Sequence, residues 1–364
     1  MIGEQGFRAP HDALQGKITG QVSVSTFKHL SVFRAAGFLA VSIVMTAARP
    51  LATTAQQRPP NPPAVELEVL QVRPSFYMIA GAGSNIAVQI GADGAVVVDA
   101  GLAERADAVI AEIRKLTNQP IRYVIDTNAD PDHIGGNEKL SRAGESIVPT
   151  GGLNNMAAYG GRAPILAEEH VQNRMSAPTG KQSKFPEAAW PTSTYSSASG
   201  ENRKDIFINS EAVRLFYQPA AHSDADSLVF FRRSDVIVTG DVFDMTRFPV
   251  IDIENGGTIQ GVIDSLNRVI ELAVPAIPLV WQEGGTLVIP GHGRLCSKDD
   301  VVNYRDMVTI IRDIVQDQIK KGMSLDEIEK ANPTQGYRRR FGVESGAFTT
   351  DRFVEVVYKS LAKR

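Results

Sequence analysis

The chain has 364 residues, 43% of them hydrophobic and 22% charged, so it is long enough to bury a sizeable core and is neither fibrous nor compositionally disordered. Its net charge of −3, without a long basic run, gives nucleic acid no electrostatic footprint. The single cysteine, Cys296, can form neither an internal disulfide nor a zinc–thiolate cluster. Any metal must therefore be held by nitrogen and oxygen.

Residues 1–55 have the order of an export signal. Lys28, His29 and Arg34 precede an apolar run at 35–48, and small residues follow up to Ala55. The run is short for a membrane span, so we predict an exported protein, periplasmic or secreted, with no span once the leader is removed. The alternative is an uncleaved helix that anchors the protein. Residues 56–64 are rich in proline and predict an extended linker.

From residue 65 onward, β-branched runs alternate with helical patterns, which predicts an α/β protein. Strands are expected at 95–98, 122–125, 227–231, 235–239 and 286–289. Apolar residues at helical spacing predict helices over 102–116, 259–270 and 307–315, and Ser324 with Glu327 forms a capping box for a fourth. We expect one domain over 65–298 and a C-terminal helical extension over 299–364 packed on it.

Polar residues follow four of these strands. Asp99 follows the first strand, the segment TNADPDHIGGN (127–137) follows the second, and Asp241 and His292 follow two others. His222 lies five residues before the strand at 227–231 and can enter the same region from a loop. Sites are commonly built where strands deliver loops at one sheet edge, so the pattern predicts a functional site there.

The residue types in this pattern suit a metal. Imidazole nitrogen and carboxylate oxygen are the ligands of zinc, iron and manganese in hydrolytic sites. A single histidine is more often a structural side chain. However, Asp130, Asp132 and His133 fall within four residues and are followed by Gly135 and Gly136, and this density favours metal binding.

TNADPDHIGGN resembles the H-x-H-x-D-H-x-G-G signature of the metallo-β-lactamase superfamily. The blocks VVVDAG (96–101), AHSDADS (221–227), TGDVFD (239–244) and IPGHG (289–293) match that family in the same order. The resemblance implies a four-layered αβ/βα sandwich with a metal cleft between two sheets and C-terminal helices beyond it. The pairing of Gly240 and Asp241 with the GHG block is more similar to the glyoxalase II and lactonase branches than to true β-lactamases.

Carried over position by position, the resemblance implies a ligand set. Asp132, His133 and His292 match the ligands of the family's second metal site. His222 matches the third histidine of the first site, and Asp241 matches the carboxylate that bridges both metals.

The first site departs from the signature, because Asn128 and Asp130 stand where its first two histidines would be. Asp130 can still bind a metal, whereas Asn128 offers only a weakly donating amide oxygen. Two divalent ions, three carboxylates and a bridging hydroxide sum to zero charge, so the hydroxide should be less acidic than usual. Oxygen ligands also favour harder ions. We expect one or two divalent ions, Zn²⁺ foremost with Mn²⁺ or Fe²⁺ as alternatives; an empty first site or no functional metal stays open.

Such a site supports hydrolysis, with Asp132 binding one metal and orienting the nucleophile. Asp99 and Asp226 are expected to hold loop backbone or a ligand histidine, with a purely structural role as the alternative. The loop 151–200, which contains Met156, Tyr159, Met175, Trp190 and Tyr195, is expected to cover the cleft or else to be a packed surface excursion.

The predicted substrate is a small molecule with an ester, thioester or lactone bond. Hydrolysis of a β-lactam amide is an alternative, as is a scaffold that binds a ligand without turnover. The sequence does not predict an oligomeric state.

Overall fold

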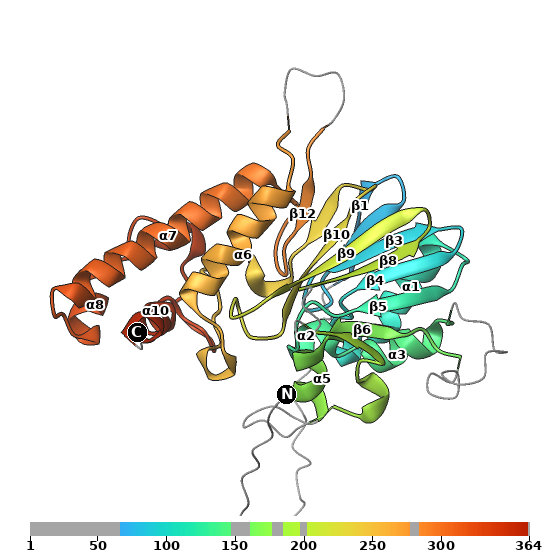
Figure 1. The fold of residues 1–364 in the computed structure, drawn as a ribbon, viewed down its shortest axis with the longest axis horizontal. Helices are drawn as coiled ribbons and strands as arrows, with labels where there is room; N and C mark the ends of the chain where they lie inside the picture. Colours follow the sequence, from blue (N-terminus) through green and yellow to red (C-terminus); the bar gives the residue numbers. More distant parts are fainter. Residues whose placement is uncertain (1–65, 147–160, 177–184, 197–201, 277–283, 363–364) are drawn as a thin grey trace, which may run out of the picture. The chain divides into compact units, whose positions relative to one another are not determined.

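The structure is a computed structural model that describes residues 66–146, 161–176, 185–196, 202–276 and 284–362. Two β-sheets lie face to face, and helices cover their outer faces (Figure 1). The predicted leader at 1–55 and linker at 56–64 lie outside the described residues. Within the described ranges, no helix combines the length and the apolar composition that crossing a membrane requires.

The first sheet has seven strands in sequence order. They are β1 (Glu68–Arg73), β2 (Phe76–Ala80), β3 (Ile86–Gly91), β4 (Gly94–Val98), β5 (Ile121–Ile125), β6 (Ile165–Glu168) and β7 (Ser193–Tyr195). Strands β1 to β4 are antiparallel neighbours, and β4 to β7 run parallel. The strands predicted at 95–98 and 122–125 are confirmed as β4 and β5.

The second sheet has six strands in the order β13-β12-β11-β10-β9-β8. They are β8 (Arg203–Ile208), β9 (Glu211–Gln218), β10 (Asp226–Phe231), β11 (Val236–Val238), β12 (Leu287–Ile289) and β13 (Cys296–Ser297). The pair β11 and β12 is parallel, and the other pairs are antiparallel. The strands predicted at 227–231, 235–239 and 286–289 are confirmed as β10, β11 and β12.

The helices include all four that the sequence predicts. The α-helices are α1 (Ala106–Leu116), α2 (Pro131–Ile134), α3 (Asn137–Ala143), α5 (Glu169–Ser176), α6 (Ile259–Leu272), α7 (Lys298–Lys320), α8 (Leu325–Ala331), α9 (Arg338–Phe341) and α10 (Thr350–Ala362). Short 3-10 helices are η1 (Ala103–Arg105), η2 (Glu187–Ala189), η4 (Gly240–Val242) and η5 (Ile253–Asn255). Helix α7 begins well before the predicted 307, because Ser297 and Asp300 form a capping box there.

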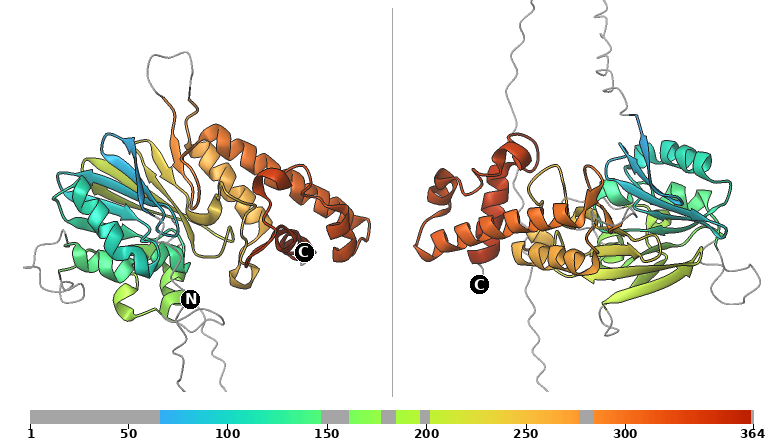
Figure 2. Two further views of the ribbon diagram at one scale, coloured as in Figure 1. Left: turned by 180° about the vertical axis from the view of Figure 1, so that it is seen from behind. Right: turned by 90° about the horizontal axis from the view of Figure 1, so that it is seen from above.

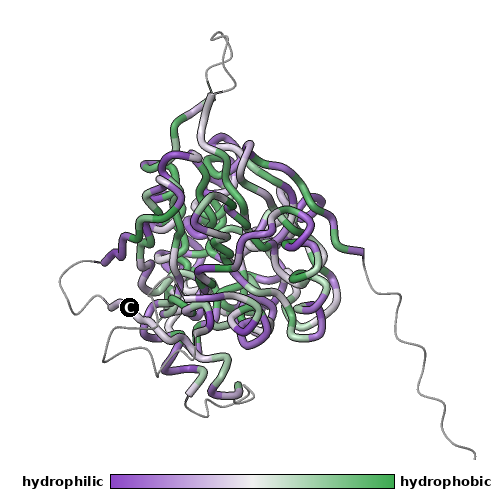
Figure 3. Tube along the Cα trace, turned by 90° about the vertical axis from the view of Figure 1, so that its right-hand side faces the viewer, coloured by the Kyte–Doolittle hydropathy of each residue, from purple (hydrophilic) through white to green (hydrophobic). Residues whose placement is uncertain are grey.

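Three hydrophobic cores separate four layers. One core fills the space between the sheets and includes Ile125, Val229 and Val238. A second lies between the first sheet and helices α1 and α3, and a third joins the second sheet to α6, α7 and α10. Figure 2 shows helices outside each sheet, and Figure 3 shows hydrophobic residues concentrated in the interior. The predicted four-layered sandwich with C-terminal helices is confirmed.

The excursion at 151–200 is not the long connector that the sequence suggests. Its described part contains β6, α5 and β7, which extend the first sheet. Strand β6 is only four residues long, and all four are buried. A strand this short shows neither a period-2 nor a helical pattern, so the sequence does not indicate it.

Candidate metal centre

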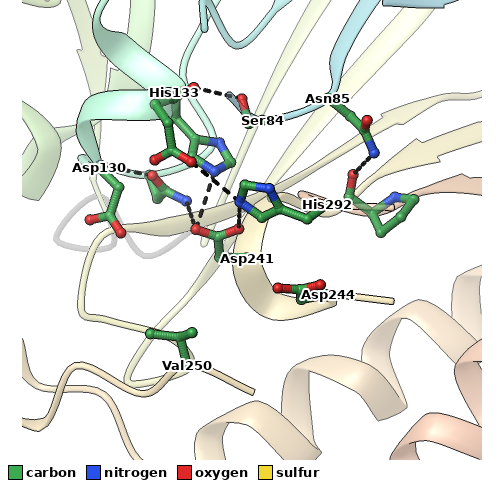
Figure 4. A network of polar contacts seen from close by, with 12 residues as sticks. Ser84, Asn85, Asp130, His133, Asp241, Asp244, Val250 and His292 are labelled. Carbon is green, nitrogen blue, oxygen red and sulfur yellow. Dashed lines mark hydrogen bonds and ion pairs between the residues drawn. The ribbon is translucent and has the colours of Figure 1, made fainter. Parts of the chain in front are cut away.

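The predicted site residues meet at one edge of the two sheets (Figure 4). Asp99 directly follows β4, and the segment 127–137 follows β5 and includes α2. Asp241 lies in η4 just after β11, while His292 lies in the turn after β12. The Gly291 N–H donates to the Gly240 carbonyl at 2.9 Å, so the turns that carry Asp241 and His292 are tied together.

One group of candidate ligands contains Asp132, His133 and His292, each of which offers a ligand atom within 4.8 Å of the others. The Nε2 atom of His292 lies 3.3 Å from Asp132 Oδ2 and 3.3 Å from Asp241 Oδ1. The Nε2 atom of His133 lies 3.1 Å from Asp241 Oδ2. These are the residues that the sequence assigned to the second metal site.

The second group contains Asp130, His222 and Asp241, again with ligand atoms within 4.8 Å of one another. His222 Nε2 lies 3.2 Å from Asp130 Oδ2. Asp241 belongs to this group and also contacts His133 and His292 of the first group. Its carboxylate therefore lies between the two groups, as a bridging ligand would.

The two most buried histidines are held with Nε2 toward the centre. His133 Nδ1 lies 2.9 Å from Asp99 Oδ2, and His222 Nδ1 lies 2.8 Å from the Val250 carbonyl oxygen. A carbonyl or an ionised carboxylate only accepts, so Nδ1 carries the proton that it donates. Asp99 also accepts from the Thr127 N–H at 2.8 Å. Asp99 thus contacts both the candidate ligand His133 and the loop backbone at Thr127.

The arrangement of donor atoms fits a cation. Among the described residues, His133 Nε2 and Asp241 Oδ1 are buried and neither makes a well-formed hydrogen bond, although His133 Nε2 lies 3.1 Å from Asp241 Oδ2 and Asp241 Oδ1 lies 3.3 Å from His292 Nε2. Leaving buried polar atoms unsatisfied is costly, and an ion between them would satisfy both. A Cβ at Gly291 would lie 2.3 Å from Asp241 Oδ1, so glycine keeps this space open.

Asn128 is oriented against metal binding. Its Oδ1 accepts the Asp130 N–H at 2.9 Å, which leaves Nδ2 at 3.4 Å from Asp241 Oδ2. The backbone N–H can bond only to the amide oxygen, so the orientation is fixed, and Nδ2 has no lone pair to offer a metal. The predicted weak amide-oxygen ligand at Asn128 stays a prediction, since in this structure that oxygen faces the Asp130 N–H. The side chain instead supports Asp130 and Asp241.

Asp226 holds the loop that carries His222. Its carboxylate accepts from the Ser223 N–H at 2.6 Å and lies 3.3 Å from Ser223 Oγ. Burial raises the pKa of Asp226 to about 7, and the nearby His222 offsets only part of that rise. Of the two expected roles, the structure gives Asp226 the contact with loop backbone.

Sequence reasoning missed two residues of the turn between β2 and β3 that fix the segments carrying Asp132 and His292. The Ser84 hydroxyl donates to the Asp132 carbonyl at 2.7 Å. The Asn85 amide donates to the carbonyls of Pro290 and Gly293, both at 2.9 Å, and so fixes the turn of His292. Both side chains are buried in the structure, but in the sequence they are polar residues between two apolar strands, which is typical of any turn, so no sequence signal identifies them.

A cavity of about 510 Å³ opens on the centre. Its walls include Asp130, Asp132, Asp241, Asp244, Arg247, Val250, His292 and, from the C-terminal extension, Val343 and residues 345–348. No described residue of 161–196 lines it. Met175 and Tyr195 are buried in cores and Trp190 packs against one, while Met156 and Tyr159 lie outside the described residues. Within the described residues, the C-terminal extension, and not 151–200, forms that wall.

A sequence model of the metallo-β-lactamase superfamily matches residues 79–292 of this chain, more than half its length. The chain belongs to the metallo-β-lactamase superfamily. Most members of that superfamily are hydrolases, and the prediction of a superfamily enzyme is thereby confirmed. No curated protein is similar enough in sequence to match.

Several solved structures resemble the chain in fold. The stereoselective inverting sec-alkylsulfatase Pisa1 from Pseudomonas sp. aligns with a TM-score of 0.55 and 13% identity over 80% of this chain, which spans 50% of that protein. A metallo-β-lactamase from Pontibacter korlensis aligns with a TM-score of 0.48 and 14% identity, over 67% of this chain and 99% of its own. The DIM-1 metallo-β-lactamase aligns with a TM-score of 0.48 and 16% identity, over 67% of this chain and 97% of its own.

The charges of this superfamily site favour imidazolium in the metal-free protein. Burial lowers the pKa of His133, but the carboxylates of Asp241 and Asp99 outweigh it and hold the pKa well above its usual value. Burial also acts against His292, yet its close contacts with the carboxylates of Asp132 and Asp241 raise its pKa to about 10. Burial would raise the pKa of Asp241, and the histidines lower it well below the ordinary range.

Metal binding should therefore release protons. At pH 8 the metal-free His292, whose pKa is raised to about 10, is protonated and has no lone pair on Nε2. We expect a divalent ion to displace at least one proton from each chain, and the apparent affinity to fall as the pH is lowered. Calorimetric titration of chelator-treated protein in two buffers of different ionisation enthalpy measures this release. Equal binding enthalpies in both buffers would contradict the prediction.

A third acidic group, formed by Glu168, Glu169 and His170, has ligand atoms within 4.8 Å of one another. Here the buried Glu168 carboxylate already accepts from the His170 N–H at 2.6 Å and lies 2.9 Å from its Nδ1. The group is internally satisfied, so we assign it no metal.

Proposed function

We propose that this protein is a metal-dependent hydrolase of ester, thioester or lactone bonds. The observation that carries the proposal is the pair of adjacent ligand groups that share Asp241 and open on one cavity. Asp132, His133 and His292 would hold one ion, and Asp130, His222 and Asp241 the other. When bound, such ions polarise a scissile carbonyl oxygen and make a bound water more acidic.

The chain's own groups would supply orientation and proton acceptance. Burial acts to raise the pKa of Asp132, but its hydrogen bond with His292 and the charge of His133 lower it, so the carboxylate is ionised at neutral pH. An ionised Asp132 on the cavity wall can accept a hydrogen bond from the attacking water and hold it toward the substrate. Asp99 and the Val250 carbonyl keep the imidazoles of His133 and His222 in place.

The ester class is favoured over amides by the residue at position 241. A carboxylate there, paired with the GHG turn, resembles the glyoxalase II and lactonase branches. Three carboxylates in the two groups also balance more of the ions' charge than histidines would, which makes bound water less acidic and favours harder ions such as Mn²⁺ or Fe²⁺ beside Zn²⁺.

A second candidate function is ligand binding without turnover, with one ion in the second site. The orientation of Asn128 favours this second function. With the Asn128 amide oxygen turned to the Asp130 N–H, the first site has three protein ligands and no fourth from Asn128, and two of the three are carboxylates. Hydrolysis of a β-lactam amide is a further alternative, and a panel of hydrolysis substrates would detect it.

The test is a hydrolysis panel of lactone, thioester, β-lactam and phosphodiester substrates with the metal-loaded protein. We expect turnover of the lactone or thioester, and a loss of at least about 100-fold in kcat for Asp132→Asn, the scale of a lost acid–base group. Asp107→Asn is a matched control, because that exposed carboxylate on α1 pairs with Lys139 outside the cavity. Metal binding with no turnover of any substrate would instead support the ligand-binding function.

A further inference from the structure

Helix α5 packs against both loops that supply the ligand group of Asp130, His222 and Asp241, which we call the His222 group. Figure 1 shows α5 close to α2, the helix that follows Asp130. One buried apolar cluster contains residues of α5 and of the two loops, among them Val171, Met175, Ala129 and Ala225. Ala129 directly precedes Asp130, and Ala225 lies three residues after His222. No residue of α5 lines the cavity, so the helix can act on this group only from behind.

Arg174 is a buried charged residue of α5 that reaches the loop of His222. Its Nη2 donates to the Asp224 carboxylate and, at 3.0 Å, to the Asn255 carbonyl. Only 6% of the side chain is exposed, although arginine is among the residues that are least often buried. Asp224 lies two residues after His222, and Asn255 ends η5. A single guanidinium thus joins the loop of His222 to the segment 250–255.

The same two segments hold the imidazole of His222. Its Nδ1 lies 2.8 Å from the Val250 carbonyl oxygen, and its own carbonyl accepts from the Asp252 N–H at 2.8 Å. The direction of His222 Nε2 therefore depends on how closely the loop and the segment 250–255 are held together. The guanidinium that bonds to both segments helps to fix that direction.

Stability alone does not account for this contact. The desolvation of a guanidinium is costly, and the replacement of a buried ion pair by apolar residues of similar volume is often neutral. The Asp224 side chain is also 39% exposed, so water screens its attraction to Arg174. A planar guanidinium holds two acceptors in set directions, which an apolar side chain cannot do. The contact is therefore better explained by positioning than by stability.

We propose that Arg174 is a positioning residue for the ion of the His222 group, and that it acts by joining the two segments that hold His222. The inference rests on the proposed function and adds to that same site a residue that touches neither metal nor substrate. The other group, Asp132, His133 and His292, has no member on the joined segments. Arg174 should therefore affect one ion and not the other.

The experiment titrates the chelator-treated protein with Co²⁺ and follows the visible absorption and the heat of binding. His222→Ala and His133→Ala are the references. The absorption bands that each reference variant lacks identify the ion of its group, so the affinity of each group can be followed separately. Thermal unfolding of the metal-free variants measures any general loss of stability.

The test variants are Arg174→Met, which removes both hydrogen bonds at similar volume, Arg174→Lys, and Asp224→Asn, which keeps the shape of the carboxylate but not its charge. Arg214→Met is the matched control. It removes an ion pair with Asp205, whose two hydrogen bonds of 2.8 and 2.9 Å join β8 to β9 outside the centre.

Arg174→Met should weaken the Co²⁺ of the His222 group by about tenfold or more, the scale for residues that hold a ligand in place, and change the other ion less than about twofold. Arg174→Lys keeps the charge without the fork, so it should fall between wild type and Arg174→Met. Asp224→Asn should weaken the same ion. The double variant of Arg174→Met and Asp224→Asn should match Arg174→Met, because the two residues act through one contact. Arg214→Met should match wild type.

A purely structural role for Arg174 predicts a different pattern, in which unfolding occurs at a lower temperature and both ions are weakened alike or not at all. Equal weakening of both ions, or an unchanged ion in the His222 group, would overturn the proposal. If circular dichroism shows Arg174→Met to be unfolded, Arg174→Lys and Asp224→Asn decide by the same comparison.

Co²⁺ binding separates this inference from the proposed function, because it requires no turnover. If wild type binds both ions but hydrolyses no substrate, and Arg174→Met weakens only the ion of the His222 group, the positioning role stands and the hydrolase proposal fails. If wild type is a hydrolase and Arg174→Met binds both ions as wild type does, the hydrolase proposal stands and the positioning role falls. If wild type binds no ion that His222→Ala loses, there is no ion to position, and the inference is overturned.

Discussion

His133→Ala and His292→Ala should each reduce hydrolysis by more than about 100-fold and lower the metal content by about one ion per chain. Residues that only support a ligand typically cost 10- to 100-fold in affinity or activity, so a ligand itself should cost more. Both side chains also contact Asp241, so losing either imidazole leaves that buried carboxylate short of a partner. Kinetics and elemental analysis of the purified variants measure the two effects.

The matched control is His170→Ala. His170 is a half-buried histidine that pairs with Glu168 and lies outside the two ligand groups. Its removal should leave metal content and hydrolysis at the wild-type level. Equal metal loss in all three histidine variants would mean that His133 and His292 act through general stability, and the assignment of ligands would be wrong.

Asp241→Asn should have the largest effect on metal stoichiometry. Asp241 is the one residue that belongs to the Asp130 and His222 group and also contacts His133 and His292. An amide keeps the shape of the side chain but removes the charge and replaces one acceptor oxygen by a donor, so both ions should bind more weakly. Elemental analysis should find fewer ions than in His133→Ala.

Asp205→Asn is the control for this change. Asp205 is a paired carboxylate on β8, held by Arg214, and it takes no part in the centre. It should leave the metal content unchanged. If Asp241→Asn loses one ion and keeps the other at full occupancy, Asp241 serves a single site and does not bridge.

Local sequence patterns predicted the parts of the fold that are regular. Helix α6 shows apolar residues at helical spacing, and buried strands such as β4 are continuous β-branched runs. The position of polar residues directly after strands predicted that Asp99 would lie near His133, and Asp241 near His292, because the ends of parallel strands in one sheet share an edge. That the two pairs meet follows from the way the two sheets face each other. His222 and Asp130 were candidates from their positions in the sequence, and the resemblance to the superfamily sorted the candidates into two metal sites.

What the sequence could not predict depends on contacts between distant segments. The pattern of the C-terminal extension gave no sign that Val343 and Phe348 would form a wall of the cavity, because that follows from how α9 and α10 pack on the second sheet and α6. The role of Asn128 likewise depends on the direction of its amide. That direction is set by a hydrogen bond with the Asp130 N–H that exists only in the folded turn.

The most direct test of the account is the metal content of the purified wild-type protein, measured by elemental analysis beside His133→Ala and His222→Ala. The two ligand groups predict one or two divalent ions per chain in wild type. His133→Ala should lose the ion of the Asp132, His133 and His292 group, and His222→Ala the ion of the Asp130, His222 and Asp241 group wherever that site is filled. A wild-type protein that stays metal-free after incubation with Zn²⁺, Mn²⁺ and Fe²⁺, or variants that retain the full metal content, would contradict the assignment of these residues as a metal centre.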